Sequence, residues 1–215
     1  RRKEKTRALE IAAEIKEICR PQPVELSLVP VKVPAVSAAI GVNIHFTGAP
    51  ARDLDLIRDA GFGWIRMDFA WQAIEREKGS YRFDEYDQLL DGLASRGLRA
   101  LFILDYSNRL YEESQSVRTP SGREAFARFA AASAARYKGR GVRWEIWNEP
   151  NLAQFWKPEP SPEDYAKLAI EAAKAIRAAD TDAVVLAPAS SGFPWSFLQT
   201  VFKNGMLQHV DEVTA

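Results

Sequence analysis

From residue 41 onward, the chain alternates between short apolar runs and longer amphipathic segments, and this alternation limits the possible folds more than any other feature. Segments with apolar residues at helical spacing predict helices at residues 51–61, 83–97, 121–139, 161–180 and 193–205. Apolar runs between them predict strands at residues 41–46, 63–69, 98–106, 142–150, 183–190 and 209–215. Strict alternation of strands and helices implies parallel strands joined by helical crossovers.

Two architectures fit this alternation, a doubly wound sheet and a (β/α)8 barrel. A doubly wound sheet favours a glycine-rich phosphate turn after its first strand, and residues 47–53, TGAPARD, do not form one. A barrel keeps its chemistry at the carboxyl ends of its strands. Polar residues follow the predicted strands at those ends: His45, Arg66, Asp68, Asp105, Tyr106, Asn148, Glu149 and Ser190. We therefore predict an α/β fold that is an incomplete (β/α)8 barrel of about six units.

The first 40 residues differ in pattern from the rest. Apolar residues recur at helical spacing from about residue 3 to residue 19, and Pro21 and Pro23 end that pattern. We predict a helix and a linker or extended segment over residues 1–40 and a partial barrel domain over residues 41–215. The chain begins RRKEK, with no Met and no signal peptide, so we expect both ends to be cuts.

Composition excludes some classes of function. Lys plus Arg and Asp plus Glu both number 29, so the chain lacks the basic excess of a nucleic-acid-binding protein. No apolar run is long enough for a membrane span. The single cysteine, Cys19, cannot form a disulfide within the chain. The sequence gives no indication of the oligomeric state.

Residues 143–151, RWEIWNEPN, place two polar residues directly after a buried strand. A carboxylate there is costly unless it is paired, hydrogen-bonded or used. Pro150 favours an extended backbone at Glu149, which would hold it at the strand end. Trp144 and Trp147 could form an apolar wall that raises the pKa of Glu149 and suits it to general acid catalysis. The alternative is a structural Glu149, paired with an arginine or with backbone.

Residues 144–151, WEIWNEPN, closely resemble the fourth-strand motif of clan A glycoside hydrolases, which are retaining enzymes on a (β/α)8 barrel. The motif is most similar to that of family 39, with family 5 as the near neighbour. Residues 64–87, WIRMDFAWQAIEREKGSYRFDEYD, resemble a second stretch of that family, Trp-x-x-Ile-Glu-x-x-x-Gly-x-Tyr-x-Phe. The resemblance covers residues 41–215, implies no cofactor, and favours a secreted or periplasmic location.

The resemblance implies a role for three residues. Glu149 would be the general acid/base, Asn148 would bind the sugar 2-hydroxyl, and Arg66 would lie under the nucleophilic carboxylate. That nucleophile comes from a seventh strand in the clan, and this sequence contains no seventh strand. We therefore expect the chain alone to be an incomplete and inactive fragment. Asp68 and Asp105 are the only candidates to replace the nucleophile, and Glu145 is expected to form a buried ion pair.

The implied ligand is an oligosaccharide or polysaccharide. Aromatic faces suit the apolar faces of sugar rings, although core packing explains any single aromatic residue equally well. A long loop, residues 107–120, also lies on the catalytic side and is expected to be functional. His45 at the end of the first strand is expected to contact substrate. The candidate binding residues are thus Asn148, Arg66, His45, Trp71, Tyr106, Trp156 and Trp195, with Phe155 as a further rim aromatic.

Two alternatives stay open. A glycan-binding module without catalysis would keep the aromatic residues and would not depend on Glu149. A barrel metallohydrolase would use His45, Asp68, Asp105 and Glu149 as metal ligands. The sequence has no His-x-His pair, and His209, its only other histidine, lies at the opposite end of its strand, so we expect no metal.

Overall fold

The computed structural model describes residues 39–215, and the helix and linker predicted for residues 1–40 lie almost wholly outside this range. Its main sheet has five parallel strands: β1 (Gly41–Asn43), β2 (Trp64–Ala70), β5 (Arg99–Asp105), β6 (Arg143–Ile146) and β7 (Val184–Leu186). Between successive strands lie the helices α2 (Ala51–Asp59), α4 (Asp84–Ala94), α5 (Pro120–Arg136) and α6 (Pro162–Ala179). The helix α7 (Trp195–Lys203) and the 3-10 helix η2 (Met206–Gln208) follow β7.

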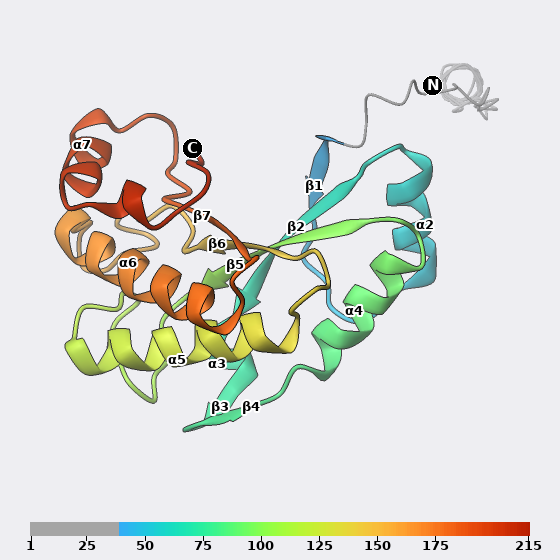
Figure 1. Cartoon of the computed structure of the whole chain (residues 1–215), viewed down its shortest axis with the longest axis horizontal. Coiled ribbons are helices and arrows are strands. Elements are labelled where there is room, and N and C mark those ends of the chain that lie inside the picture. Colours follow the sequence, from blue (N-terminus) through green and yellow to red (C-terminus); the bar gives the residue numbers. More distant parts are fainter. Residues whose placement is uncertain (1–38) are drawn as a thin grey trace, which may run out of the picture. The chain divides into compact units, whose positions relative to one another are not determined.

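The strands lie in the order β1-β2-β5-β6-β7, so each strand pairs with the next main-sheet strand along the chain (Figure 1). The register is continuous, with Trp64 paired to Gly41 on one side and to Arg99 on the other. A doubly wound sheet reverses its strand order at a switch point, whereas a barrel does not. The observed order therefore confirms the predicted barrel arrangement over the doubly wound one.

The sixth predicted strand, at residues 209–215, is only partly formed. This segment runs beside β7 through a parallel bridge between Leu186 and Glu212. Backbone hydrogen bonds continue it, from Thr214 N to Ala187 O at 3.4 Å. The N–H of Val185 donates to the Asp211 side chain, at 2.8 Å, where a regular ladder would use a backbone carbonyl. The position of the strand is confirmed, and its regular pairing is interrupted by Asp211.

The two faces of the sheet differ in chemistry because side chains alternate along each strand. One face packs against the helices through an aromatic cluster centred on Phe69. The Phe69 ring lies 4.3 Å from Tyr86, 5.0 Å from Phe102 and 5.5 Å from Trp144, measured between centroids. Arg66 points to the opposite face, where it lines a cavity. This second face corresponds to the interior of the barrel.

The residues predicted to begin and end helices are found at the helix ends. Ser161 caps α6 by accepting a hydrogen bond from the N–H of Asp164, with Pro162 in the first turn. Gly61 and Gly97 follow α2 and α4 with positive φ angles of 87° and 69°, a conformation that glycine adopts at little cost.

Sequence analysis did not predict the small insertion after β2. It comprises the single-turn helix α3 (Trp71–Ile74) and an antiparallel hairpin of β3 (Glu75–Glu77) and β4 (Ser80–Tyr81). Gly79 turns the hairpin with a φ of 79°. The insertion extends below the sheet in the view of Figure 1.

Candidate active site

Neighbouring residues of a regular strand point to opposite faces, so Asn148 and Glu149 can serve one site only if they lie outside the strand. Both do, because β6 ends at Ile146. The chain turns sharply here, with φ angles of 71° at Trp147 and 48° at Glu149. The expected extended backbone at Glu149 is therefore wrong. The turn is held by a hydrogen bond from Glu149 N to Ala189 O (2.9 Å), which ties it to the segment after β7.

Glu149 is half-buried and opens on a cavity of about 340 Å³ that runs along the interior face of the sheet to the residues following β6 and β7. The cavity is bounded by side chains from β2, β5 and β6 and by residues that follow β6 and β7. Its lining comprises Arg66, Leu101, Glu145, Asn148, Glu149, Ala189, Ser190, Thr214 and Ala215. The structure thus brings Arg66, Asn148 and Glu149 together, as the barrel prediction requires.

A hydrogen-bonded chain of side chains supports this cavity. The buried Glu145 carboxylate accepts from Arg66 Nε at 2.7 Å and forms an ion pair with its Nη2 at 2.6 Å. Arg66 Nη2 also donates to Asn148 Oδ1 at 3.0 Å, and Asn148 Nδ2 donates to the Tyr106 hydroxyl at 3.0 Å. The predicted ion pair of Glu145 is confirmed. Since Arg66 holds the Asn148 carbonyl oxygen, the amide nitrogen of Asn148 is left for the Tyr106 hydroxyl and for a ligand.

Asp105 ends β5 as a fully buried carboxyl group, and neither of its oxygens has a hydrogen-bond partner within residues 39–215. Burial, followed by the negative charge of Asp68, holds the pKa of Asp105 well above its usual range. Burial, followed by the charge of Asp105, likewise raises the pKa of Tyr106. Asp105 is fully buried and does not line the cavity of Glu149, which argues against its predicted use as a replacement for the nucleophile.

The apolar wall predicted beside Glu149 is wrong. Trp144 faces the helices, with its ring 5.5 Å from Phe69, on the opposite face of β6 from Glu145. Trp147 is fully buried, donates from Nε1 to Phe155 O at 3.1 Å, and packs 5.0 Å from Trp156. Neither indole is among the residues that line the cavity. The positive φ at Trp147 interrupts the alternation of side chains along the strand, so its ring does not point to the face that the alternation would give it.

Two predicted sugar-binding tryptophans lie in the core instead. Trp71 is fully buried, stacks on Tyr111 at 5.3 Å, and donates from Nε1 to Glu75 at 2.5 Å. Trp156 is fully buried and packs against Trp147 and Tyr165. A ring with no exposed face cannot stack on a sugar, so these two predictions are corrected.

The remaining predicted binding residues are at least partly accessible. His45 is exposed just after β1, and Tyr106 is half-buried with its ring stacked 5.6 Å from Phe155. Trp195 is 74% exposed and stacks 5.9 Å from Phe193. Their contact with substrate stays a prediction.

Sequence reasoning missed Asn151, Phe193 and Glu75. Asn151 belongs to the quoted motif, and its position two residues after Glu149 was the available signal. Its side chain makes two hydrogen bonds to the backbone of Ser191, at 3.1 and 2.9 Å. Glu75 follows Trp71 by four residues, a spacing that favours contact on a helix.

The long loop over residues 107–120 is tied down rather than open. Its Tyr111 hydroxyl donates to Glu75 at 2.6 Å, and Ser116 donates to Lys157 O at 2.8 Å. Thr119 donates through its N–H and its hydroxyl to the Glu112 carboxylate. The loop therefore braces the segment that follows Glu149.

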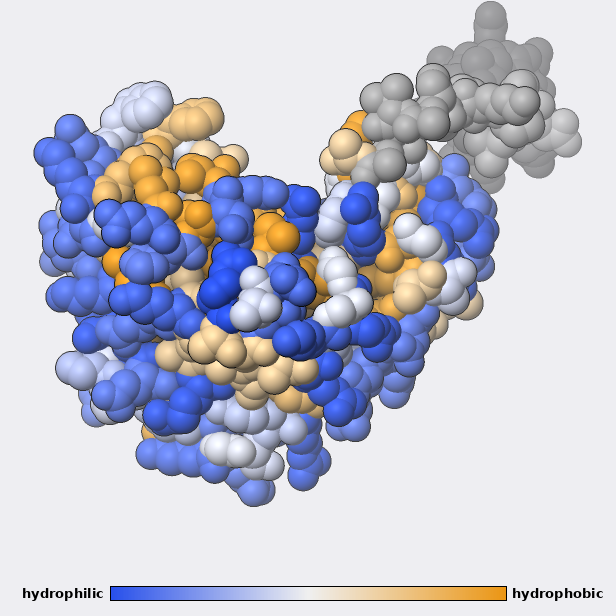
Figure 2. Space-filling model, in the orientation of Figure 1, coloured by the Kyte–Doolittle hydropathy of each residue, from blue (hydrophilic) through white to orange (hydrophobic). Residues whose placement is uncertain are grey.

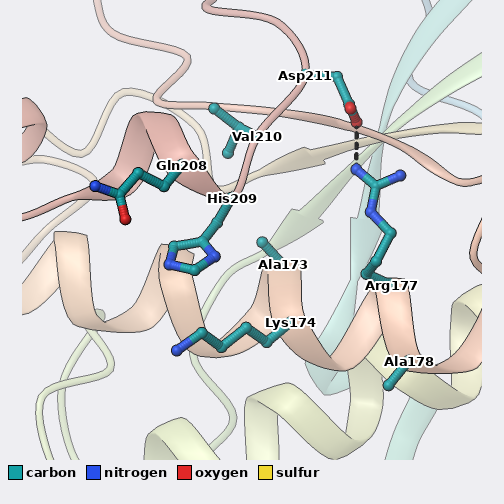
Figure 3. A pocket seen from close by; sticks show the side chains of 8 residues that line it. All are labelled: Ala173, Lys174, Arg177, Ala178, Gln208, His209, Val210 and Asp211. Carbon is teal, nitrogen blue, oxygen red and sulfur yellow. Dashed lines mark hydrogen bonds and ion pairs between the residues drawn. The ribbon is translucent and has the colours of Figure 1, made fainter.

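A second cavity, of about 350 Å³, lies between α6 and the residues around η2 (Figure 3). Asp211 forms an ion pair with Arg177 at 2.7 Å and accepts a hydrogen bond from Val185 N. These two contacts hold the segment around Asp211 beside β7. His209 projects beside Lys174 of α6. It belongs to this cavity and does not line the cavity of Glu149.

Two findings concern the metal and membrane predictions. Over residues 39–215, no group of three or more His, Cys, Asp or Glu side chains has the arrangement of a metal site. Within the same range, no helix is long and apolar enough to span a membrane.

Comparison with known proteins agrees with this geometry. A model of the cellulase family, glycosyl hydrolase family 5, matches residues 29–206. A 6-phospho-beta-glucosidase from Dickeya chrysanthemi is 29% identical over 128 residues, which are 56% of this chain and 28% of that protein. The chain thus spans less than a third of that relative's length.

Solved structures share the fold. A family 39 glycoside hydrolase from Bacteroides cellulosilyticus WH2 has a TM-score of 0.69 at 24% identity, over 80% of this chain and 37% of that one. A beta-xylosidase from Caulobacter crescentus CB15 has a TM-score of 0.65 at 24% identity, over 81% of this chain and 40% of that one. The resemblance to clan A glycoside hydrolases and the partial (β/α)8 barrel are confirmed. The chain belongs to the cellulase family, glycosyl hydrolase family 5.

Proposed function

We propose that this chain supplies the acid/base half of a retaining glycosidase site, with Glu149 as the general acid/base. The observation that carries the proposal is the position of Glu149. It is half-buried at the carboxyl end of β6, opens on a cavity, and follows an asparagine held by an arginine. Retaining glycosidases need a carboxyl group in such a place, able to give up and regain a proton beside the glycosidic oxygen.

In the first step, Glu149 protonates the oxygen of the leaving group while a second carboxylate attacks the anomeric carbon. In the second step, the Glu149 carboxylate takes a proton from water, and the water oxygen releases the sugar from the covalent intermediate. We propose that the nucleophile comes from outside residues 39–215. Glu145, the other carboxylate side chain that lines the cavity, is committed to Arg66.

Asn148 is proposed to bind the sugar 2-hydroxyl. An amide nitrogen carries two N–H donors, and the Tyr106 hydroxyl accepts one of them. The second is the proposed donor to the sugar. Arg66 fixes the amide orientation by donating to Oδ1, and Glu145 fixes Arg66. This hydrogen bond strengthens as the transition state forms, so it accelerates the reaction beyond simple binding.

The substrate is proposed to be a β-linked oligosaccharide or polysaccharide. The relatives named above include a 6-phospho-beta-glucosidase and a beta-xylosidase, and the family is described as cellulase. The cavity holds polar hydrogen-bonding groups from Arg66, Asn148 and Glu149, which suit sugar hydroxyls. His45 and Tyr106 are proposed as further substrate contacts on the same edge of the sheet.

The test compares Glu149→Gln with unchanged protein, in a form of the chain continued to a closed eight-stranded barrel. Loss of a general acid costs roughly 100- to 10,000-fold in kcat for substrates with poor leaving groups. Substrates whose leaving group needs no proton should lose far less in the first step. Glu124→Gln, on the exposed face of α5, is the matched control and should leave turnover unchanged.

Equal losses for good and poor leaving groups would contradict the acid role of Glu149. If the continued protein binds glycans but never hydrolyses them, with or without Glu149, the chain is a binding module. The exposed pair Phe193 and Trp195 is the observation that favours this second candidate, because aromatic platforms bind sugars without a carboxylate.

A further inference from the structure

Three residues other than glycine have a positive φ within residues 39–215, and all three lie in the two segments beside the cavity of Glu149. They are Trp147 (71°), Glu149 (48°) and Ala189 (53°). The left-handed region is unfavourable for such residues, and they keep it only where the surrounding structure holds them there. Specific contacts must therefore hold the turn after β6 and the segment after β7.

Backbone hydrogen bonds join two of these residues directly. Glu149 N donates to Ala189 O at 2.9 Å, and Glu149 O accepts from Leu152 N at 3.0 Å. Ala189 N donates to the Thr214 hydroxyl at 3.0 Å. A change to negative φ at either residue would turn these groups away from their partners. The turn and the segment are thus held together or lost together.

Side-chain packing supports this region on one side only. Ala189 and Ser190 line the cavity on the other side. Figure 2 shows the molecule hollowed between the side that carries α7 and the side that carries β1. The segment after β7 leads to α7 and borders this hollow. Hydrogen bonds must therefore supply the restraint that packing does not.

The side chain of Asn151 supplies two such hydrogen bonds. It donates to Ser191 O at 3.1 Å and accepts from Ser191 N at 2.9 Å, so one planar amide satisfies both backbone groups. Only Pro150, whose ring fixes φ, separates Asn151 from Glu149. The Cα atoms of residues 149 and 151 therefore lie at most about 7 Å apart, and a displacement of Asn151 moves Glu149 as well.

We propose that Asn151 is a positioning residue for Glu149, because its side chain fastens the turn after β6 to the segment after β7. This inference rests on the proposed glycosidase function and adds to it the residue that orients the acid/base. A general acid acts only within hydrogen-bond reach of the glycosidic oxygen, and a misplacement of about 1 Å can cost roughly 100-fold in rate. Loss of Asn151 should therefore impair proton transfer more than substrate binding.

The first experiment uses the 215-residue chain and needs no turnover. Site-resolved amide hydrogen exchange follows the Glu149 N–H, which donates to Ala189 O. Asn151→Ala should lower its protection by roughly tenfold or more, because two hydrogen bonds that hold the acceptor segment are lost. Asn204→Ala is the matched control, since it also removes a side-chain hydrogen bond to backbone, to Thr200 O at 2.8 Å, and should leave the Glu149 amide unchanged. Unchanged protection in Asn151→Ala would overturn the proposal.

The second experiment measures turnover in the protein continued to a closed barrel. For Asn151→Ala, kcat/KM should fall roughly 10- to 100-fold with poor leaving groups and less than about threefold with a dinitrophenyl glycoside, which needs no proton. Asn151→Asp has the same shape and keeps the acceptor for Ser191 N, so its loss should be intermediate. Equal losses with both leaving groups would reduce Asn151 to a purely structural role and overturn the proposal.

A double-mutant cycle with Ala189→Gly tests the link through the strained segment. Glycine removes the cost of the left-handed conformation, which corresponds to roughly 5- to 30-fold in population. The loss caused by Asn151→Ala should therefore be several-fold smaller when Ala189→Gly is present. Additive effects of the two changes would contradict this link.

Failure of this inference is distinct from failure of the proposed function. If Glu149→Gln shows no dependence on the leaving group, the acid role of Glu149 is wrong, and exchange of the Glu149 amide still decides whether Asn151 holds the turn. If Glu149→Gln behaves as an acid variant and Asn151→Ala does not, the proposed function stands and Asn151 is not a positioning residue.

Discussion

Asn148 and its neighbours show how one short strand serves two purposes. Trp144 and Ile146 are buried, and Trp144 faces the helices, whereas Glu145 faces the interior and pairs with Arg66. Beyond the strand, the turn brings Asn148 and Glu149 to the same cavity. In this motif, the strand residues Trp144 to Ile146 stabilise the fold, and the residues after the strand, Asn148 and Glu149, are the ones proposed for the chemistry.

Asn148→Ala should lower kcat/KM by roughly 10- to 100-fold in the protein continued to a closed barrel, because a hydrogen bond that strengthens in the transition state is lost. The loss should largely disappear with a substrate that lacks the 2-hydroxyl. Asn204→Ala, at the exposed end of α7, is the control. An equal loss with the 2-deoxy substrate would show that Asn148 acts elsewhere.

Asp105→Asn should raise the free energy of unfolding at pH 7. Burial and the charge of Asp68 raise the pKa of Asp105 in the folded state above its unfolded value. The folded state therefore binds the proton more tightly, and stability from this group is full below the unfolded pKa and declines as pH rises to the folded pKa. The substituted amide does not titrate, and its N–H donors take the place of the O–H of the protonated carboxyl.

The measurement is urea unfolding of both proteins from pH 4 to pH 8, with exposed Asp182→Asn as the control. The stability difference should be small at pH 4 and grow with pH. A difference that stays constant across this range would contradict the raised pKa of Asp105.

Individual residues were predictable where chain geometry fixes their surroundings. Glu145 was expected in a buried ion pair and forms one with Arg66. It lies within a strand and faces the same interior side of the sheet as Arg66. Trp71 was expected at the rim but is buried by Glu75 and Tyr111. A position after a strand end does not reveal whether the chain then folds back over the ring.

At the scale of elements, the alternating pattern predicted all five main-sheet strands, the four crossover helices α2, α4, α5 and α6, and α7 after the last strand. Glycines and caps fixed where helices end, as at Ser161 and Gly97. The hairpin of β3 and β4 was missed because its strands have three and two residues, too few for a periodic signal. What defines that hairpin is a set of hydrogen bonds to one buried carboxylate.

The Glu75 carboxylate gives a testable prediction for the hairpin of β3 and β4. Glu75 accepts from Trp71 Nε1, Gly79 N and the Tyr111 hydroxyl. Glu75→Gln replaces one acceptor oxygen with an NH2 donor, which leaves at least one buried donor unpaired. We expect a loss of about 1–3 kcal/mol in the free energy of unfolding.

Hydrogen exchange should show the Gly79 amide losing protection, while amides of β5 keep theirs. Glu77→Gln, an exposed residue of the same hairpin, is the control and should change stability by less than about 0.5 kcal/mol. Equal effects of the two variants would show that Glu75 does not organise the hairpin.

At the scale of the whole molecule, the described strands form a continuous parallel sheet in barrel order, and the cavity of Glu149 opens on its interior face. Of the carboxylate side chains that line this cavity, Glu145 is neutralised by Arg66. We therefore expect the 215-residue chain by itself to bind glycans without hydrolysing aryl glycosides. Turnover by this chain with a trapped covalent intermediate would contradict that expectation.

The most direct test of the acid/base assignment is azide rescue of Glu149→Ala in the protein continued to a closed barrel. Without the acid/base, the covalent intermediate waits for a nucleophile that needs no deprotonation, and azide can enter the space left by the removed carboxylate. We predict restored turnover of an activated aryl glycoside and a glycosyl azide with the anomeric configuration of the substrate. A glycosyl azide of inverted configuration would identify residue 149 as the nucleophile, and an absence of rescue would contradict its role as the base.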